Sequence, residues 1–440
     1  MLTAFGRAFR TPDLRKKILF TLAIMGLFRL GSVVPAPGVN YQNIHSCIDQ
    51  AQNSSIYGLV NLFSGGALLQ LSVFALGIMP YITSSIIIQL LIVVIPRLER
   101  LKEQGQGGQA KLTQYTRYLT IALAILQSTG IVALARSSNG SASRLFPNCN
   151  KSLLYSTSIF RIGVLVIVMT AGTAVIMWLG ELITDRGIGN GMSLLIFTSI
   201  ASRFPSQGSQ ILQTKGPTTF TIVLILGLLI MTAIVFMEQG QRRIPVQYAK
   251  RMIGRRMYGG TATYIPLKVN QAGVIPVIFS SSLLYLPQLV AQVWSSNTGL
   301  NQFVSNYFVR GDSATYVLTY AVLTIFFTYF YVAITFNPVE VSDNMRKYGG
   351  FIPGIRPGRP TAEYLEYVLS RITLPGALYL TIVAVLPIIA LAFLPGNSSG
   401  VNQTFPFGGT SVLILVGVGL DTSKQIESQL MLRNYEGFLR

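Results

Sequence analysis

The chain has 440 residues, of which half are hydrophobic and only 11% are charged, against roughly 25% charged residues in an ordinary soluble protein. So few charges cannot cover a globule of this size with solvated side chains, which excludes a soluble multidomain enzyme. Lysine and arginine outnumber the acidic residues by 34 to 15, and in a polytopic membrane protein such a surplus marks the cytoplasmic loops.

The amino terminus carries basic residues from Arg7 to Lys17, followed by an apolar run at 18–28. A secretory signal begins in this way, but no small-residue cleavage site follows here. Because many further apolar stretches come after it, we interpret the run as the first membrane span, starting on the inside.

Charge-poor runs of spanning length predict ten transmembrane helices. They lie at 18–36, 72–95, 116–135, 154–178, 188–203, 217–237, 270–292, 314–334, 371–393 and 408–428. Of the 34 basic residues, two lie within spans (Arg29 and Arg161) and six in outer loops, which leaves 26 on the inner side. A missed or invented span would invert every later loop, so this asymmetry supports ten spans with both termini cytoplasmic.

Ten spans divide into an N-terminal half (1–203) and a C-terminal half (217–440), joined by an outer hinge loop at 204–216. Five spans per half mean that equivalent segments run in opposite directions. Inverted repeats of this kind place a functional site between the halves, near the bilayer midplane. This interpretation rests on the count of spans, since the halves share no convincing sequence identity.

No charged residue occurs between Asp49 and Arg97, a stretch too long for one crossing. Two crossings would invert the charge assignment downstream, so we predict one span at 72–95, preceded by a short re-entrant piece at about 60–71. Ser64-Gly65-Gly66 would break that piece. Irregular backbone at membrane depth needs protein or a water-filled cavity around it, which predicts a central cavity that contains the piece.

Two predicted cytoplasmic loops, 238–268 and 335–370, are too long to be plain connectors. In the first, the alternating stretches 244–248 and 261–267 predict a β-hairpin. In the second, glycine and proline around Arg356 predict a rigid, exposed turn. Their charge and turn chemistry indicate a docking surface for a large anionic partner.

Residue types that usually carry chemistry are scarce. His45 is the only histidine, so no His-based metal cluster is possible, and two cysteines exclude a thiolate zinc site. Cys47 and Cys149 both fall in predicted outer loops, where an oxidising compartment would allow a bridge, although isolated cysteines are more often unpaired. We expect no cofactor and no catalytic site.

Seven motifs, spread almost end to end, resemble those of the SecY family, the pore-forming subunits of the bacterial Sec protein translocase. They are FSGGAL at 63–68, FALGIMPYI at 74–82, GELITDRGIGNG at 180–191, GQRRIP at 240–245, PLKVN at 266–270, GIRPG at 354–358 and FGGTS at 407–411. The resemblance implies an all-α protein whose ten transmembrane helices form two inverted five-helix halves around a central pore, with a re-entrant plug helix. The loops 137–153, 293–313 and 394–406 match no family pattern.

The resemblance also implies site residues. The pore ring falls on Ile78, Ile82, Ile196, Ile278 and Ile414. The plug comprises Leu62, Phe63, Ser64, Gly65, Gly66, Ala67 and Leu68. A lateral gate between spans 72–95 and 270–292 carries the polar residues Thr83, Gln127 and Asn270, which are costly to bury unless they hydrogen-bond to one another. Docking of the motor or ribosome falls on Arg242, Arg243, Lys250, Arg251, Arg255, Arg256 and Arg356.

The function implied is a passive protein-conducting channel of the plasma (inner) membrane. It would translocate unfolded preproteins that carry signal sequences and release apolar segments sideways into membrane lipid. The partners implied are the small membrane subunits SecE and SecG, the SecA motor ATPase and the ribosome. The chain has no Gly-rich nucleotide-binding loop of the Lys-Ser/Thr type, so a partner must supply the energy.

Two alternatives come from other classes. A secondary transporter with inverted repeats would share the ten spans, but it normally keeps an ionisable coupling residue near the midplane. Here Arg29 and Arg161 sit toward the outer ends of spans, where snorkelling suffices. An intramembrane hydrolase would need a Ser/His pair or paired carboxylates within the bilayer, and neither His45 nor Asp421 provides one.

Overall fold

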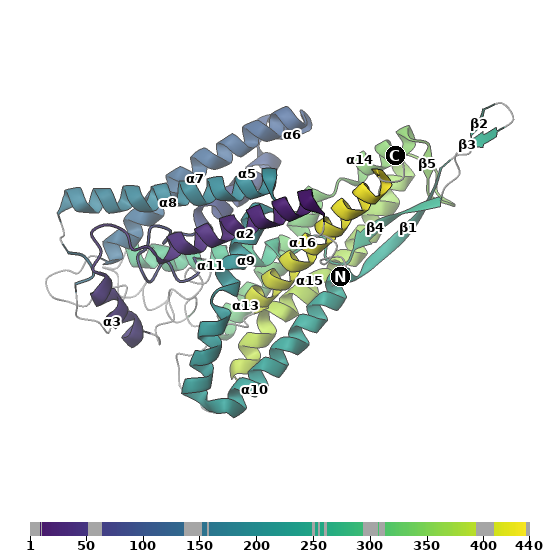
Figure 1. The fold of residues 1–440 in the computed structure, drawn as a ribbon. Helices are drawn as coiled ribbons and strands as arrows, with labels where there is room; N and C mark the ends of the chain where they lie inside the picture. Colours follow the sequence, from purple (N-terminus) through teal and green to yellow (C-terminus); the bar gives the residue numbers. More distant parts are fainter. Residues whose placement is uncertain are drawn as a thin grey trace.

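The computed structural model describes residues 9, 11–51, 64–135, 152–155, 158–248, 251–253, 256–258, 262–293, 307, 313–392 and 409–436. Within them, every one of the ten predicted spans overlaps a helix (Figure 1). These helices are α2 (Pro12–Val33), α5 (Met79–Val94), α7 (Gln106–Ala135), α8 (Ile159–Arg186), α9 (Gly191–Ala201), α10 (Phe204–Gln239), α11 (Ile275–Val293), α13 (Ala314–Thr335), α15 (Arg359–Ala392) and α16 (Gly409–Glu436). The described residues also form α3 (Tyr41–Ala51), α6 (Pro96–Glu103) and α14 (Pro338–Lys347).

Length and hydropathy alone single out fewer spans. Five of the described helices are long and apolar enough to cross a membrane, or six if α5 and α6, bent by 100° at Ile95, count as one. Helix α9 is too short, with 11 residues. Several helices also extend beyond the predicted apolar runs, α7 and α15 at their starts and α16 at its end, because polar side chains continue a helix outside the apolar region.

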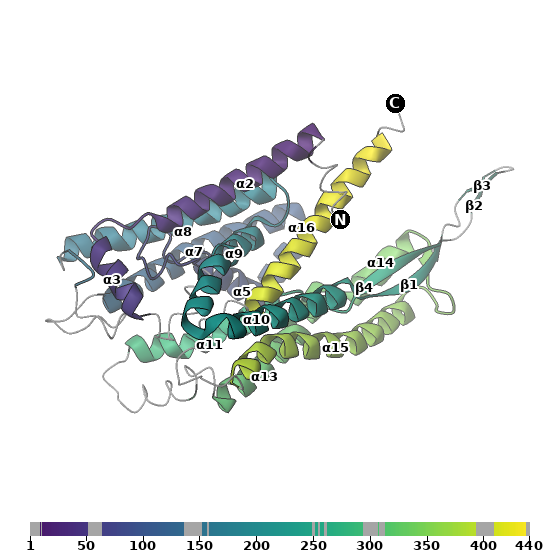
Figure 2. The ribbon, with the colours of Figure 1, turned by 60° about the horizontal axis from the view of Figure 1, so that its bottom comes forward.

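The helices pack in two groups (Figures 1 and 2). In the N-terminal group α8 contacts α2, α7 and α9, and α7 contacts α5. In the C-terminal group α13 contacts α11 and α15, while α16 contacts α10 and α15. Contacts between the groups include α9 with α16 and α5 with α11. The two groups therefore meet in two places, one between α9 and α16 and the other between α5 and α11.

The segment before α5 corrects the predicted start of the second span. Residues 64–78 form successive turns, so the helix does not begin at residue 72, and the described part of the re-entrant piece is not regular helix. The backbone φ is +45° at Leu71 and +58° at Gly77, a left-handed conformation that no α-helix tolerates. Helix α5 begins only at Met79, with Pro80 in its first turn, where a missing N–H costs no hydrogen bond.

The predicted loop at 204–216 is also wrong, because these residues are helical and belong to α10. Pro205 lies in the first turn, where its fixed φ favours a helix start. The helix breaks only at Gly216, with φ of +81°, just before Pro217. The boundary between the two predicted halves is therefore a kinked helix, and the hinge role of 204–216 stays a prediction.

The predicted β-hairpin is confirmed. Strand β1 (Gln241–Tyr248) pairs antiparallel with β4 (Ala262–Lys268), with Ile244 opposite Ile265. A third strand, β5 (Gly350–Phe351), comes from the loop 335–370 and pairs with the end of β1. The short strands β2 (Arg251–Ile253) and β3 (Arg256–Tyr258) pair with each other at the far end, well beyond the helices (Figures 1 and 2). Both long loops therefore build one projecting structure.

Cys47 lies on α3, at the end of the molecule opposite the hairpin (Figures 1 and 2). Its side chain is fully buried and forms a disulfide. The sequence left open whether the cysteines are bridged or unpaired, and in the structure Cys47 is bridged. Cys149, the other cysteine of the chain, lies outside the described residues.

Candidate functional site

The five isoleucines assigned to the pore converge from four parts of the chain. Ile78 directly precedes α5, which carries Ile82, and the other three lie on α9, α11 and α16. All five belong to one apolar cluster, in which four are buried and Ile82 is partly buried. We refer to Ile78, Ile82, Ile196, Ile278 and Ile414 as the isoleucine cluster.

Local sequence sets where two of these side chains lie. The positive φ of Gly77 turns the chain into α5 and so positions Ile78 at its start. The Asn190 side chain accepts hydrogen bonds from the backbone N–H groups of Met192 and Ser193, which fixes the start of the short helix that carries Ile196. The cluster therefore depends on helix starts as well as on apolar runs.

Close backbone packing brings α9 against α8. Gly191 lies so near the carbonyl of Gly180 that an added Cβ would overlap that oxygen. The backbone N–H of Gly191 also donates to the hydroxyl of Thr184, at 2.9 Å. Glycine at 191 is therefore required by the approach of two helices, and this approach holds Ile196 in the cluster.

The described residues that were assigned to the plug lie in the 64–71 turn. Ser64, Ala67 and Leu68 are buried, and the Ser64 hydroxyl accepts a hydrogen bond from the backbone N–H of Leu68, at 3.2 Å. Gly65 and Gly66 have φ of +65° and +95°, which only glycine adopts without strain. Leu62 and Phe63 lie outside the described residues.

The three polar residues assigned to the lateral gate are not joined to one another by any hydrogen bond of the described residues. The Thr83 hydroxyl donates to the Met79 carbonyl of its own helix, at 2.7 Å, and Gln127 is half-buried on α7. The buried Asn270 amide donates to Glu238 Oε2 at 3.0 Å and to the Gly273 carbonyl at 3.2 Å. The sequence did not predict Glu238 as the partner of Asn270, because the spacing of the two residues carries no recognisable pattern.

The contact between α5 and α11 is apolar instead. Ile86 and Phe279 are buried in one cluster with Phe327 of α13, and the Phe279 and Phe327 rings meet edge to face, with centroids 5.7 Å apart. Apolar contacts of this kind separate without leaving unsatisfied hydrogen-bonding groups. The seam between α5 and α11 is thus held by packing among the described residues.

The described residues that were assigned to docking lie on the projecting hairpin and the nearby turn. Arg242 and Arg243 are exposed on β1, and the Arg243 guanidinium lies 4.9 Å from the centre of the Tyr264 ring on β4. Arg356 is exposed, and its carbonyl accepts a hydrogen bond from the Thr361 hydroxyl, at 2.8 Å. Arg251 and Arg256 belong to β2 and β3, whereas Lys250 and Arg255 lie outside the described residues.

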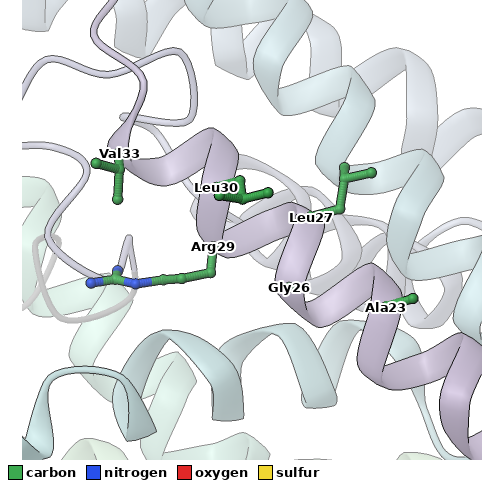
Figure 3. A pocket seen from close by; sticks show the side chains of 6 residues that line it. All are labelled: Ala23, Gly26, Leu27, Arg29, Leu30 and Val33. Carbon is green, nitrogen blue, oxygen red and sulfur yellow. The ribbon is translucent and has the colours of Figure 1, made fainter.

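An apolar groove of about 680 Å³ runs along α2 and is lined by Ala23, Gly26, Leu27, Arg29, Leu30 and Val33 (Figure 3). Its lining is almost entirely hydrocarbon, so it offers no polar group to orient a small ligand other than Arg29. The described residues also contain no group of three His, Cys, Asp or Glu side chains that could hold a metal ion.

Comparison with known proteins points to one family. The family model described as SecY matches residues 72–423. The chain is 63% identical to the protein translocase subunit SecY of Streptomyces galbus, over the whole of both chains. It is similar in fold to a solved structure described as showing that the plug domain of SecY stabilises the closed state of the translocation channel. The TM-score is 0.63 and the identity 16%, and the match covers 94% of this chain and 91% of that one.

A second solved structure, of Sec61 in the canine ribosome-channel complex from the endoplasmic reticulum, is similar with a TM-score of 0.55 and 16% identity. It too covers 94% of this chain and 91% of that one. At such low identity, the two structures establish a shared fold and nothing about individual residues.

Proposed function

The chain belongs to the SecY family, and we propose that its isoleucine cluster is the waist of a protein-conducting pore. Its fold is the ten-span fold of that family, with a plug, and its function is to translocate polypeptides and to release apolar segments into lipid through a lateral gate. The secondary-transporter alternative finds no support, because a relative 63% identical to this chain is a translocase subunit.

The observation that carries this proposal is the convergence of the five isoleucines. They come from the start of α5 and from α9, α11 and α16, which belong to both helix groups. Ring members drawn from both groups can move apart when the groups part. A ring of aliphatic side chains offers no hydrogen bond to water, so it is dry when empty and blocks ions, and it contacts a passing chain without preferring a sequence.

The seam and the plug follow from the same arrangement. Helices α5 and α11 would part along the apolar contact of Ile86 and Phe279, which exposes the pore to lipid. The 64–71 turn, with Leu62 and Phe63 before it, would form the plug that covers the isoleucine cluster at rest. Thr83, Gln127 and Asn270 would lie along the gate, and residues 204–216 would hinge the two halves.

The proposed partners rest on the exposed basic residues of the hairpin and on the proteins that this chain resembles. The arginines of β1, together with Arg356, form an exposed basic surface on the projecting hairpin, which suits phosphates or carboxylates. The family belongs to a translocase with other subunits, and a fold-related channel binds a ribosome. We infer docking of the ribosome or the SecA motor here, with SecE and SecG as small partner subunits and energy supplied by the docked partner.

The proposed location is the plasma membrane, with both termini and the hairpin in the cytoplasm. The excess of basic residues on one side of the predicted topology supports this orientation. In the structure the basic hairpin and α3 lie at opposite ends of the helices, as this orientation requires (Figure 1).

Serine substitution tests the pore. In a reconstituted channel, Ile78→Ser combined with Ile414→Ser should raise ion conductance at rest, because each hydroxyl offers water a hydrogen-bonding partner. Removing residues 62–68 should add to the leak. The matched control is Ile230→Ser, a buried position of α10 in a different apolar cluster. It should lower stability by roughly 2–4 kcal/mol through its cavity, without leak. Folded double-serine protein that stays as tight as the parent would show that these isoleucines only pack.

A further inference from the structure

The Arg29 side chain reaches from α2 to the 64–71 turn. Its Nη1 donates a hydrogen bond to the backbone carbonyl of Gly65, at 2.7 Å, and a longer one to the Ser32 hydroxyl, at 3.3 Å. Figure 3 shows the Arg29 side chain extended clear of α2, toward the side of the view on which Val33 lies. The one arginine in the first predicted span is therefore bonded to the 64–71 turn.

The turn is enclosed where Arg29 meets it. A Cβ added to Gly65 would lie 3.3 Å from the Ser199 Cα on α9, and one added to Gly66 would lie 3.5 Å from the Arg203 guanidinium. Since both glycines have positive φ, side chains there are disfavoured by conformation as well as by space. The Gly65–Gly66 pair thus lies between α2 on one side and the end of α9 on the other.

The other end of the turn is tied to the chain just after α2. The backbone N–H of Ala36 donates to the Leu71 carbonyl at 3.1 Å, and the N–H of Val73 donates to the Val34 carbonyl at 3.0 Å. Both bonds join backbone to backbone, so no single side chain controls them. At the Gly65 end the bond to α2 comes from one side chain, Arg29.

We propose that Arg29 is the residue that holds the plug closed, through its bond to the Gly65 carbonyl. A guanidinium donating to a carbonyl in a partly buried site makes a charge-assisted bond, stronger than a neutral one. Displacing the turn breaks this bond while the backbone bonds at Leu71 remain, so the turn would swing about its Leu71 end. This inference rests on the proposed function, because it takes the 64–71 turn as the plug.

The experiment compares three substitutions in the channel purified with its partner subunits. Arg29→Met removes the donors at similar length, and Arg29→Lys keeps one charged donor. Arg161→Met is the matched control, since Arg161 is exposed on α8. Each is made alone and together with Ala67→Cys, which places a thiol at a fully buried position of the turn. The measurements are planar-bilayer conductance at rest and the rate at which a water-soluble reagent labels this introduced thiol in membrane vesicles.

Losing a charge-assisted bond should raise the population of the displaced turn by about tenfold or more. We therefore expect Arg29→Met to raise resting conductance and the labelling rate at position 67 by that order. Arg29→Lys should give a smaller increase, and Arg161→Met should match the parent. The partial rescue by lysine separates a hydrogen-bonding role from packing of the long side chain. If Arg29→Met folds poorly in detergent, the labelling rate is read for Arg29→Gln in native membranes.

The deletion of residues 62–68 separates this inference from the function beneath it. If the deletion leaks while folded Arg29→Met stays tight and the thiol introduced at position 67 stays protected, Arg29 does not hold the plug, although the pore assignment stands. If even the deletion leaves conductance unchanged, the 64–71 turn is not a plug, and both assignments fall.

Discussion

Asn270 donates a hydrogen bond from its side-chain amide to the Glu238 carboxylate, over 3.0 Å, where the β1–β4 hairpin joins the helices. Glu238 lies at the end of α10, just before β1, and Asn270 follows β4 on the way to α11. Beside them the Val269 N–H donates to the Gly240 carbonyl at 3.0 Å, and Lys268 pairs with Asp421 of α16 at 3.5 Å. The hairpin that carries the arginines proposed for docking and helix α11 therefore share one junction.

Breaking that bond should destabilise the junction. Glu238→Leu removes the acceptor of a buried amide, at a cost of about 1–3 kcal/mol in the free energy of unfolding. Glu238→Gln keeps an acceptor oxygen and should cost less. A double-mutant cycle with Asn270→Leu, read by thermal unfolding in detergent, measures the coupling. Strictly additive effects would show that the two side chains do not stabilise each other.

The seam should respond to apolar truncation more than to loss of a hydroxyl. Phe279→Ala removes a ring packed on Phe327 and should cost about 3–5 kcal/mol. Thr83→Val should cost less than about 1 kcal/mol, since the Thr83 hydroxyl donates to Met79 within its own helix. Thermal unfolding of both variants gives the comparison. A larger loss from Thr83→Val would restore the polar residues as the main contacts of the gate.

Gly191 should not accept a methyl group. In Gly191→Ala the new Cβ overlaps the Gly180 carbonyl and must push α9 from α8, so we expect a loss of more than about 2 kcal/mol. The control is Gly26→Ala on α2, where nothing lies within 4 Å of the added Cβ and alanine should be neutral or stabilising by about 0.5–1 kcal/mol. Thermal stability of the two proteins decides; equal stability would mean that α8 and α9 have room to separate.

Arg356→Glu should abolish partner-driven transport and leave the fold intact. The Arg356 side chain is exposed, and the Thr361 hydroxyl, at the start of α15, holds the turn through the Arg356 carbonyl, which the substitution retains. Arg359→Glu makes the same change in charge at an exposed position three residues away and should transport normally. Preprotein uptake by reconstituted vesicles provides the measurement. Equal loss in both variants would indicate a general effect of charge.

The sequence by itself determined the features that depend on neighbouring residues. Charge-poor runs predicted ten spans, and each overlaps a helix, because an apolar run favours a membrane helix even where, as in α9, the helix itself is short. Alternation located the β1–β4 hairpin, whose register depends on one repeating pattern. Family motifs placed Ile78, Ile82, Ile196, Ile278 and Ile414, which the structure gathers in one cluster, although their role as a pore remains to be measured.

Only the tertiary structure decided which distant groups meet. The partner of Arg29 lies 36 residues away and is a backbone carbonyl, which has no signature in the sequence. Asn270 bonds Glu238, rather than Thr83 or Gln127, because the closing of the hairpin brings its two ends together. The late start of α5 likewise follows from left-handed residues in a turn enclosed by other helices. A buried polar group takes the partner that the surrounding fold places within reach, and that choice is made in three dimensions.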